Sequence, residues 1–102
     1  YLAEMLKSNR TLTELWLSNN EIGNEGVDQL ASALTEKNRT LKFLSLSMNR
    51  LITDLCLDAV ISMLEKNSTL KKLWIKDCQL TSEGKERLKA HFQEKRKVMI
   101  EL

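Results

Sequence analysis

Few side chains in this sequence could carry out catalysis or bind a metal ion. The one histidine, His91, has no orienting partner nearby, so we interpret it as a solvated helix residue and not as a general base or ligand. The two cysteines, Cys56 and Cys78, lack the spacing of a zinc site. No glycine-rich phosphate-binding motif is present in the sequence. We therefore predict that the protein is not an enzyme and uses no metal or cofactor.

The residues best suited to binding chemistry are aromatic. Trp16, Phe43 and Trp74 each stand next to leucine or isoleucine in short apolar segments. Aromatic side chains exposed on one surface supply much of the binding energy at protein interfaces, and Trp does so most often. Whether these three residues share a surface depends on the elements that carry them.

The sequence repeats itself every 29 residues, and this repeat predicts the strands and helices that carry the aromatic residues. The segment that begins at Asn9 returns in near copy at Asn38 and again at Asn67. The same step aligns apolar residues in columns, namely Leu12, Leu41 and Leu70; Leu15, Leu44 and Leu73; Leu17, Leu46 and Ile75; and Ile22, Leu51 and Leu80.

Each repeat is predicted to contain a short strand followed by a helix. Leu15 and Leu17 alternate with Trp16, which is the period of a strand, while residues 27–34 carry apolar side chains at helical spacing. We expect the column Asn9, Asn38 and Asn67 to close the helices in the left-handed conformation. The same triplets form glycosylation motifs, which we interpret as this structural position copied by the repeat.

These units predict one domain over residues 1–102. It comprises the end of a truncated repeat (1–8), three repeats (9–37, 38–66 and 67–96, the last with the polar character of a cap) and a terminal strand (97–102). Because one unit cannot bury its apolar face alone, the units must stack. The predicted fold class is α/β, a horseshoe-shaped solenoid of 29-residue units with a short parallel sheet on the concave face and helices on the convex face. We expect it to be the C-terminal fragment of a longer array.

Composition excludes several classes of function. The formal net charge is only +2, and no long basic stripe is present, so we predict no nucleic-acid partner. No apolar stretch approaches the roughly 18 residues that a transmembrane helix needs, so we predict no membrane insertion. Two cysteines are too few to staple a secreted miniprotein, which favours a reducing, cytoplasmic location.

The segment from Leu12 to Gly23 resembles the leucine-rich-repeat pattern L-x-x-L-x-L-x-x-N/C-x-L/I. The unit resembles the ribonuclease-inhibitor-like class, which also forms the C-terminal repeats of NOD-like receptors of innate immunity. The constant step of 29 residues and the scarcity of cysteine make the receptor repeats the closer likeness. The resemblance implies a protein-interaction module, the ligand-sensing or regulatory repeat region of a larger intracellular protein.

Two alternatives to this function remain open. The first is a structural or autoinhibitory surface that contacts other domains of a parent NOD-like receptor. The second is a GTPase activator or an enzyme inhibitor of the ribonuclease-inhibitor type. An activator would need an exposed arginine finger, and we interpret the one candidate, Arg50, as a charge on the rim of the sheet.

Strand alternation predicts a binding surface on the concave face, because the side chains between the leucines point away from the core. Small Ser45 lies between Trp16 and Trp74 in neighbouring repeats, which predicts a slot with aromatic walls that Phe43 closes at one end. The predicted contact residues are Glu14, Trp16, Phe43, Ser45, Met48, Lys72, Trp74, Lys76 and Asp77. The alternative is that the aromatic side chains only stiffen the sheet through cross-strand contact.

The middle helix carries an additional apolar stripe of Leu57, Ile61 and Leu64. The stripe predicts a second interface, for another domain of the parent protein or for self-association. The alternative, which we prefer, is sideways packing against the flanking helices.

Overall fold

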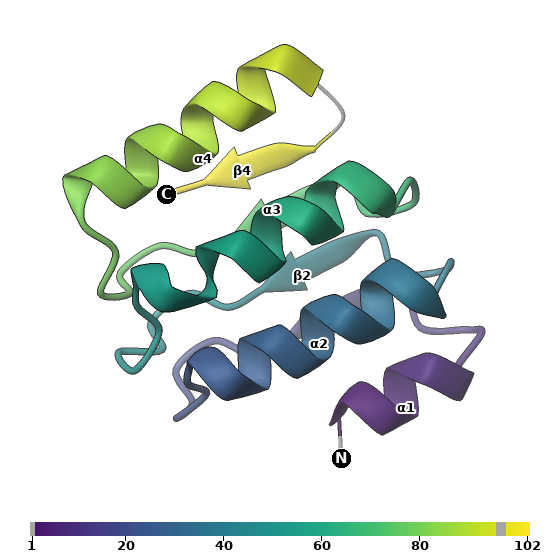
Figure 1. Cartoon of the computed structure of the whole chain (residues 1–102). Coiled ribbons are helices and arrows are strands. Elements are labelled where there is room, and N and C mark those ends of the chain that lie inside the picture. The colour runs from purple at the N-terminus through teal and green to yellow at the C-terminus, as the bar shows by residue number, and fades with distance from the viewer. Residues whose placement is uncertain (1, 96–97) are drawn as a thin grey trace.

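Strands and helices alternate along the chain, as the repeat predicts (Figure 1). The structure is a computed structural model that describes residues 2–95 and 98–102, without the side chains of 92–95. The helices are α1 (Leu2–Ser8), α2 (Asn24–Glu36), α3 (Leu57–Lys66), which follows the 3₁₀ turn η1 (Asp54–Cys56), and α4 (Ser82–Lys95). The strands are β1 (Glu14–Trp16), β2 (Phe43–Ser45), β3 (Lys72–Trp74) and β4 (Met99–Glu101). The predicted boundary at residues 96 and 97 lies outside the described residues.

The described strands form one parallel sheet in the order β1-β2-β3-β4. Glu14 lies opposite Phe43, and Phe43 lies opposite Lys72, so the register joins equivalent positions of successive repeats. The step from β3 to β4 is two residues shorter, because Lys72 pairs with Met99. The helices lie together on one side of the sheet (Figure 1). The predicted α/β class with a short parallel sheet is confirmed.

The leucine columns form the core between the sheet and the helices. Leu41, Leu44 and Leu46 around β2 are at most 2% exposed, because repeats stack on both sides of them. Leu12 and Leu15 are only partly buried, since β1 lies at the edge of the sheet. The depth of burial therefore depends on stacking between repeats.

The prediction that Leu51 belongs to the apolar core columns is wrong. Leu51 is 58% exposed, and the adjacent Ile52 fills the core with no exposed surface. The backbone turns at Arg50 and Leu51, and the N–H of Ile52 donates to the carbonyl of Asn49 at 3.1 Å. This turn directs the next side chain, that of Ile52, toward the core.

Asn49 joins two repeats from a fully buried position after β2. Its side-chain oxygen accepts hydrogen bonds from the backbone N–H groups of Asn20 at 3.1 Å and Ile22 at 3.2 Å. Its amide nitrogen donates to the carbonyls of Leu17 and Leu46, both at 2.9 Å. Asn49 therefore satisfies buried backbone groups on both sides of the turn, which a purely apolar side chain could not do.

The column Asn9, Asn38 and Asn67 has a different role from the one predicted. Asn67 has a φ of −85°, and the non-glycine residues with positive φ are Asn19, Met48 and Asp77 in the turns after the strands. The left-handed residue is therefore found after β1, β2 and β3 and not at the ends of α2 and α3.

Asn67 acts instead as a side-chain link between helix and strand. Its Oδ1 accepts from the N–H groups of Thr69 at 2.9 Å and Leu70 at 2.7 Å, and its Nδ2 donates to the carbonyl of Leu34 in α2 at 2.6 Å. Asn38 makes the equivalent bonds, including one to the carbonyl of Leu6 at 2.9 Å. Both side chains are at most 1% exposed, which agrees with a structural reading of these glycosylation motifs.

The substitution Met48→Asn is expected to raise the free energy of unfolding by about 1 kcal/mol. Met48 has a φ of 61°, where a β-carbon is crowded and where asparagine is tolerated best after glycine. The side chain is 45% exposed, so little packing is lost. Urea denaturation measures the change, and Met99→Asn, at an exposed methionine in β4, is the matched control. Equal destabilisation by both substitutions would contradict this explanation.

Asp54 of η1 links its repeat to the start of α4. Its carboxylate accepts hydrogen bonds from the backbone N–H of Thr81 at 3.0 Å and from the Thr81 hydroxyl. The carboxylate also fills the space that a β-carbon at Gly84 would need. The hydrogen bonds from Thr81 hold the pKa of Asp54 below its usual value.

The substitution Asp54→Asn is expected to flatten the loss of stability in acid. A carboxylate with a lowered pKa in the folded state contributes stability that is present above its unfolded pKa, about 4, and is lost as the pH falls through its folded pKa. Urea midpoints measured from neutral pH down to about pH 3 should show the variant and the wild type converging. Asp28→Asn, exposed on α2, is the control for removal of one carboxylate, and a pH-independent gap for Asp54→Asn would refute the linkage.

The stripe on α3 does not form an exposed second interface. Leu57 is 1% and Leu64 is 5% exposed, and Ile61 is partly buried against the core. The helix lies between α2 and α4 (Figure 1), so these side chains fill the contacts with its neighbours. Their burial agrees with the alternative of sideways packing.

His91 is also less exposed than predicted. Its side chain is 17% exposed, and its Nε2 lies 3.8 Å from a carboxylate oxygen of Glu65 on α3. The equivalent residue of α2, Ala33, has no exposed surface. This column of the repeat faces the neighbouring helix, so the interpretation of His91 as solvated is wrong.

Candidate functional site

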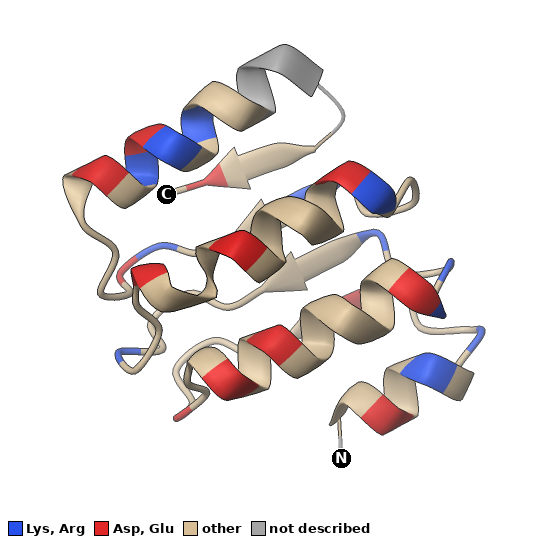
Figure 2. Ribbon diagram, in the orientation of Figure 1, with Lys and Arg blue, Asp and Glu red and all other residues tan. Residues whose placement is uncertain are grey.

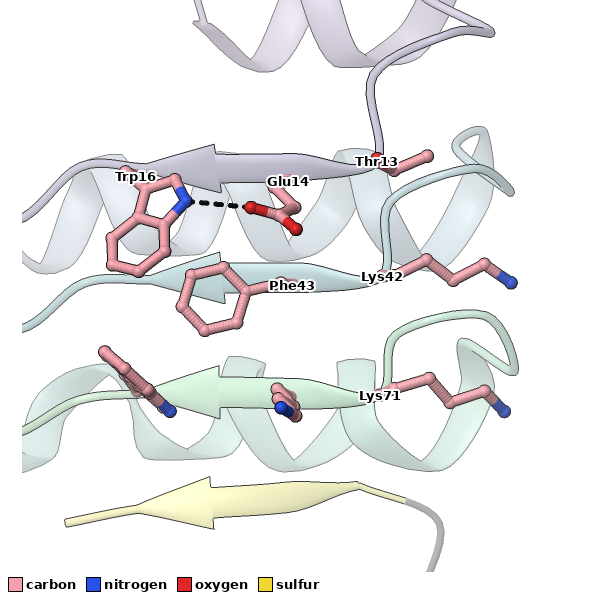
Figure 3. A pocket seen from close by; sticks show the side chains of 8 residues that line it. Thr13, Glu14, Trp16, Lys42, Phe43 and Lys71 are labelled. Carbon is pink, nitrogen blue, oxygen red and sulfur yellow. Dashed lines mark hydrogen bonds between the residues drawn. The ribbon is translucent and has the colours of Figure 1, made fainter.

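Trp16, Phe43 and Trp74 form an aromatic cluster on the open face of the sheet (Figure 3). The ring centroids are 4.5 Å apart for Trp16 and Phe43, 5.0 Å for Phe43 and Trp74, and 5.5 Å for the two tryptophans. The planes of Trp74 stand at 85° to Trp16 and 87° to Phe43, which are edge-to-face contacts. The prediction that these residues share one face of the sheet is confirmed.

The predicted slot between the tryptophans is absent. The two indoles touch, Phe43 is only 7% exposed between them, and Ser45 has no exposed surface. Strands lie about 4.8 Å apart, so rings of this size can lean together over a small serine and remove apolar surface from water. The Ser45 hydroxyl lies 2.6 Å from that of Ser18 and is out of a partner's reach.

A hollow of about 430 Å³ opens beside the aromatic cluster. Besides the cluster, its walls come from Thr13, Glu14, Lys42, Lys71 and Lys72. Lys42 and Lys71 extend side by side beyond the starts of β2 and β3 (Figure 3), and all three lysines are exposed. We call this feature the lysine-lined hollow. It gives the cluster a basic margin at the N-terminal ends of the strands.

Thr13, Lys42 and Lys71 are absent from the contact residues predicted from the sequence. They occupy one column of the repeat, and strict alternation from Trp16 assigns that column to the buried side. The strands begin only one residue later, at Glu14, Phe43 and Lys72, so alternation does not extend to it. The lysines themselves were the available signal, because an unpaired Lys is almost never fully buried.

The remaining predicted contact residues fall into two groups. Glu14 and Lys72 lie in the hollow, and the carboxylate of Glu14 accepts a hydrogen bond from Trp16 Nε1 at 3.1 Å. Met48, Lys76 and Asp77 are exposed beyond the opposite ends of the strands, away from the hollow. The structure therefore places five of the predicted residues at one site, namely Glu14, Trp16, Phe43, Lys72 and Trp74.

The helical side of the molecule has its own distribution of charge. The charged residues of α2 are all acidic, whereas α4 carries Lys85, Arg87 and Lys89 interspersed with acidic residues (Figure 2). Arg87 pairs with Asp58 across the two helices. These charges join neighbouring repeats and lie on the layer opposite the hollow.

The two cysteines, Cys56 and Cys78, have weakly reactive thiols in this fold. Burial raises the pKa of Cys56 to about 11 and also raises the pKa of Cys78. Both are free thiols, and a raised pKa keeps them in the protonated, weakly nucleophilic form at neutral pH.

Within residues 2–95 and 98–102, no group of three or more His, Cys, Asp and Glu side chains is arranged to hold a metal ion. Over the same described stretches, no helix combines the length and the apolar character needed to span a bilayer.

Two solved structures share this fold. The tropomodulin C-terminal domain of Caenorhabditis elegans is 20% identical, with a TM-score of 0.80 over 96% of this chain and 59% of that chain. Leiomodin-1 Actin-Binding Site 2 is 20% identical, with a TM-score of 0.86 over 97% of this chain and 58% of that chain. The chain thus spans less than two thirds of either structure, and identity at this level establishes the fold alone.

Sequence comparison identifies the repeat. No curated protein matches the chain. A family model described as Leucine Rich repeat matches residues 8–31, 37–59 and 66–88, one segment in each predicted repeat. The likeness to NOD-like receptors and to ribonuclease inhibitors is not shown by these matches and stays a prediction. Because the three matched segments together cover more than half of the sequence, the chain belongs to the leucine-rich-repeat family.

Proposed function

We propose that the chain is a protein-interaction module that recognises its partner through the aromatic cluster and the lysine-lined hollow. The observation that carries this proposal is Trp16 on β1, which leaves 57% of its surface exposed within a cluster of large rings. Exposed tryptophan beside a concave, partly charged surface is typical of interface hot spots. The repeat family and its actin-binding structural neighbour support a protein partner.

The alternative of a purely stiffening role accounts for only part of the site. The aromatic cluster covers Ser45 and stabilises the sheet by cross-strand contact. Trp16 contributes to that cover through its contacts with Phe43 and Trp74, yet 57% of its surface stays exposed. A stiffening role also gives no reason for lysines beside the rings. We therefore infer that the cluster serves both stability and recognition.

We propose that these repeats are a segment of a longer, curved array that forms the ligand-sensing or regulatory region of a larger protein. The edge strand β1, with the half-buried Leu12 and Leu15, supports continuation of the stack by further repeats. The free thiols support a cytoplasmic location. The horseshoe shape of the array and its regular 29-residue units are parts of this proposal. A structural or autoinhibitory surface within a NOD-like receptor is the alternative to it.

The experiment that tests the function is capture of proteins from a cell lysate by the immobilised chain. Wild type is compared with Trp16→Ala and with Leu55→Ala, which removes an 83% exposed leucine far from the cluster in the fold. Specific partners should be retained by wild type and Leu55→Ala and lost by Trp16→Ala. Actin, for which the leiomodin-1 Actin-Binding Site 2 is named, is the first protein to seek among them. Equal capture by all three chains argues against the proposed surface.

A further inference from the structure

The lysine-lined hollow carries positive charge that the described part of the chain does not neutralise. Lys42 and Lys71 hold the same position in successive repeats, and the N–H of Lys71 donates to the carbonyl of Lys42 at 2.7 Å, so their backbones are hydrogen-bonded neighbours. Lys72 follows directly. The ion pairs of the described residues involve other side chains, and the Lys71 ammonium reaches only the carbonyl of Ser68 at 3.5 Å. Three adjacent ammonium groups repel one another.

The one carboxylate in the hollow, that of Glu14, offsets only part of this charge, because three lysines line the same hollow. Glu14 lies on β1, separated from Lys72 on β3 by Phe43 on β2, and it accepts a hydrogen bond from Trp16 Nε1. The hollow therefore has an acidic corner on β1 and a basic side on β2 and β3. Such an arrangement orients a partner that brings negative charge to the lysines and an apolar group to the rings.

On the basis of the function proposed above, we propose that the partner presents an extended acidic peptide segment. An apolar side chain of that segment packs on the exposed ring of Trp16, and one or more Asp or Glu side chains pair with Lys42, Lys71 and Lys72. The shape of the hollow, about 430 Å³ and open on one side, fits one large side chain and its flanking backbone.

The fold also sets the spacing within that segment. The lysine column precedes the tryptophan position by three residues, and Lys72 precedes Trp74 by two. Strand residues rise about 3.3 Å each, so the lysines begin about 7–10 Å from the rings. An extended peptide covers this distance with two or three residues. The acidic side chain should therefore stand two or three positions from the apolar one.

A single-stranded nucleic acid is the competing anionic partner, because it also combines charge with stacking groups. The site fits it poorly. Little ring surface is free for stacking, because Phe43 is only 7% exposed and the two tryptophans contact each other edge to face. The hollow offers no arginine among its lining residues.

The test selects binders to the full chain from a library of random, unstructured peptides. The enriched sequences should carry Asp or Glu two or three positions from an aromatic or large aliphatic residue. Enrichment of sequences without acidic excess, or failure to enrich any sequence, overturns this inference. Displacement of the best peptide by homopolymeric single-stranded DNA also overturns it, in favour of a nucleic-acid site.

The best peptide is then measured against a charge variant and its matched control. Lys42→Gln with Lys71→Gln and Lys72→Gln should weaken binding about tenfold or more and reduce its dependence on salt. Lys37→Gln with Lys66→Gln and Lys89→Gln removes the same charge outside the hollow and should leave affinity within about twofold. The thermal midpoint of the first variant should not fall, because repulsion is relieved. Equal weakening by both triple variants refutes the assignment.

The outcome separates this inference from the function on which it rests. If Trp16→Ala abolishes binding but the triple lysine variant retains it, the proposal of an acidic segment is refuted and the proposed function of the aromatic cluster stands. If the peptide still binds Trp16→Ala, the proposed role of the aromatic cluster in binding is refuted. Lysate capture that depends on Trp16, together with selected peptides that lack acidic residues, likewise overturns only the chemistry proposed for the partner.

Discussion

Replacement of Asn49 by alanine is expected to lower the free energy of unfolding by about 3 kcal/mol. The substitution leaves the N–H groups of Asn20 and Ile22 without their side-chain acceptor. It also removes one of the two side-chain donors from the carbonyls of Leu17 and Leu46, which keep their bonds from Asn20 and Cys78. Buried polar groups that lose their partners cost about 1–3 kcal/mol each, and partial rehydration of Asn20 at the surface limits the total. Urea denaturation followed by circular dichroism measures the loss.

Asn20→Ala is the matched control, because it removes the equivalent side chain at the edge repeat. Asn20 is exposed and donates only to the carbonyls of Leu17 and Ser18. The expected loss is about 1 kcal/mol or less, because water can replace these bonds. Similar losses at both positions would show that the contacts of Asn49 across repeats carry no additional stability.

Trp16→Ala is expected to weaken binding of the partner by about 2 kcal/mol or more, or about thirtyfold. The substitution removes the most exposed ring of the cluster and the donor that holds the carboxylate of Glu14. Affinity is measured by calorimetry with a partner obtained from the capture experiment. Stability should fall only modestly, because more than half of the side chain faces solvent.

Trp74→Ala separates binding from stability. Trp74 is half-buried and contacts both other rings, so its removal exposes Phe43 and opens the cover over Ser45. We expect this substitution to lower the thermal midpoint more than Trp16→Ala does. If Trp16→Ala instead lowers the midpoint strongly and leaves affinity unchanged, the cluster is a stiffening device.

The period of the sequence predicted the elements well, because stacking depends on residues at fixed intervals. Leu41, Leu44 and Leu46 are buried as their columns require. The choice between Leu51 and Ile52 could not be predicted in the same way. It depends on a local turn after Asn49, and both residues are equally apolar in the sequence.

The candidate site was only partly predictable for a different reason. Alternation correctly placed Trp16, Phe43 and Trp74 on one face, since that property follows from backbone geometry. The closed contact over Ser45 depends on how far the rings lean, which is a matter of side-chain packing. The lysine column at residues 42 and 71 lies where the strand period has not yet begun.

Asparagine shows the same limit of pattern reasoning. The column of Asn38 and Asn67 was visible, but its residue type suited both a left-handed cap and a side-chain link. The carbonyls of Leu6 and Leu34 make the side-chain link possible, because they accept hydrogen bonds from Asn38 and Asn67. These carbonyls are distant from the asparagines in the sequence, so the pattern does not reveal them. The left-handed conformation occurs at Met48, a residue type that does not suggest it.

The central claim is that a partner binds on the open face of the sheet at the aromatic cluster. The most direct measurement is mapping of amide chemical shifts of the isotope-labelled full chain during titration with the captured partner. The account predicts that the largest changes fall at residues 13–16, 42–45 and 71–74 and at the indole N–H groups of both tryptophans. Changes concentrated on α2, α3 and α4, with the indole signals unmoved, would contradict it.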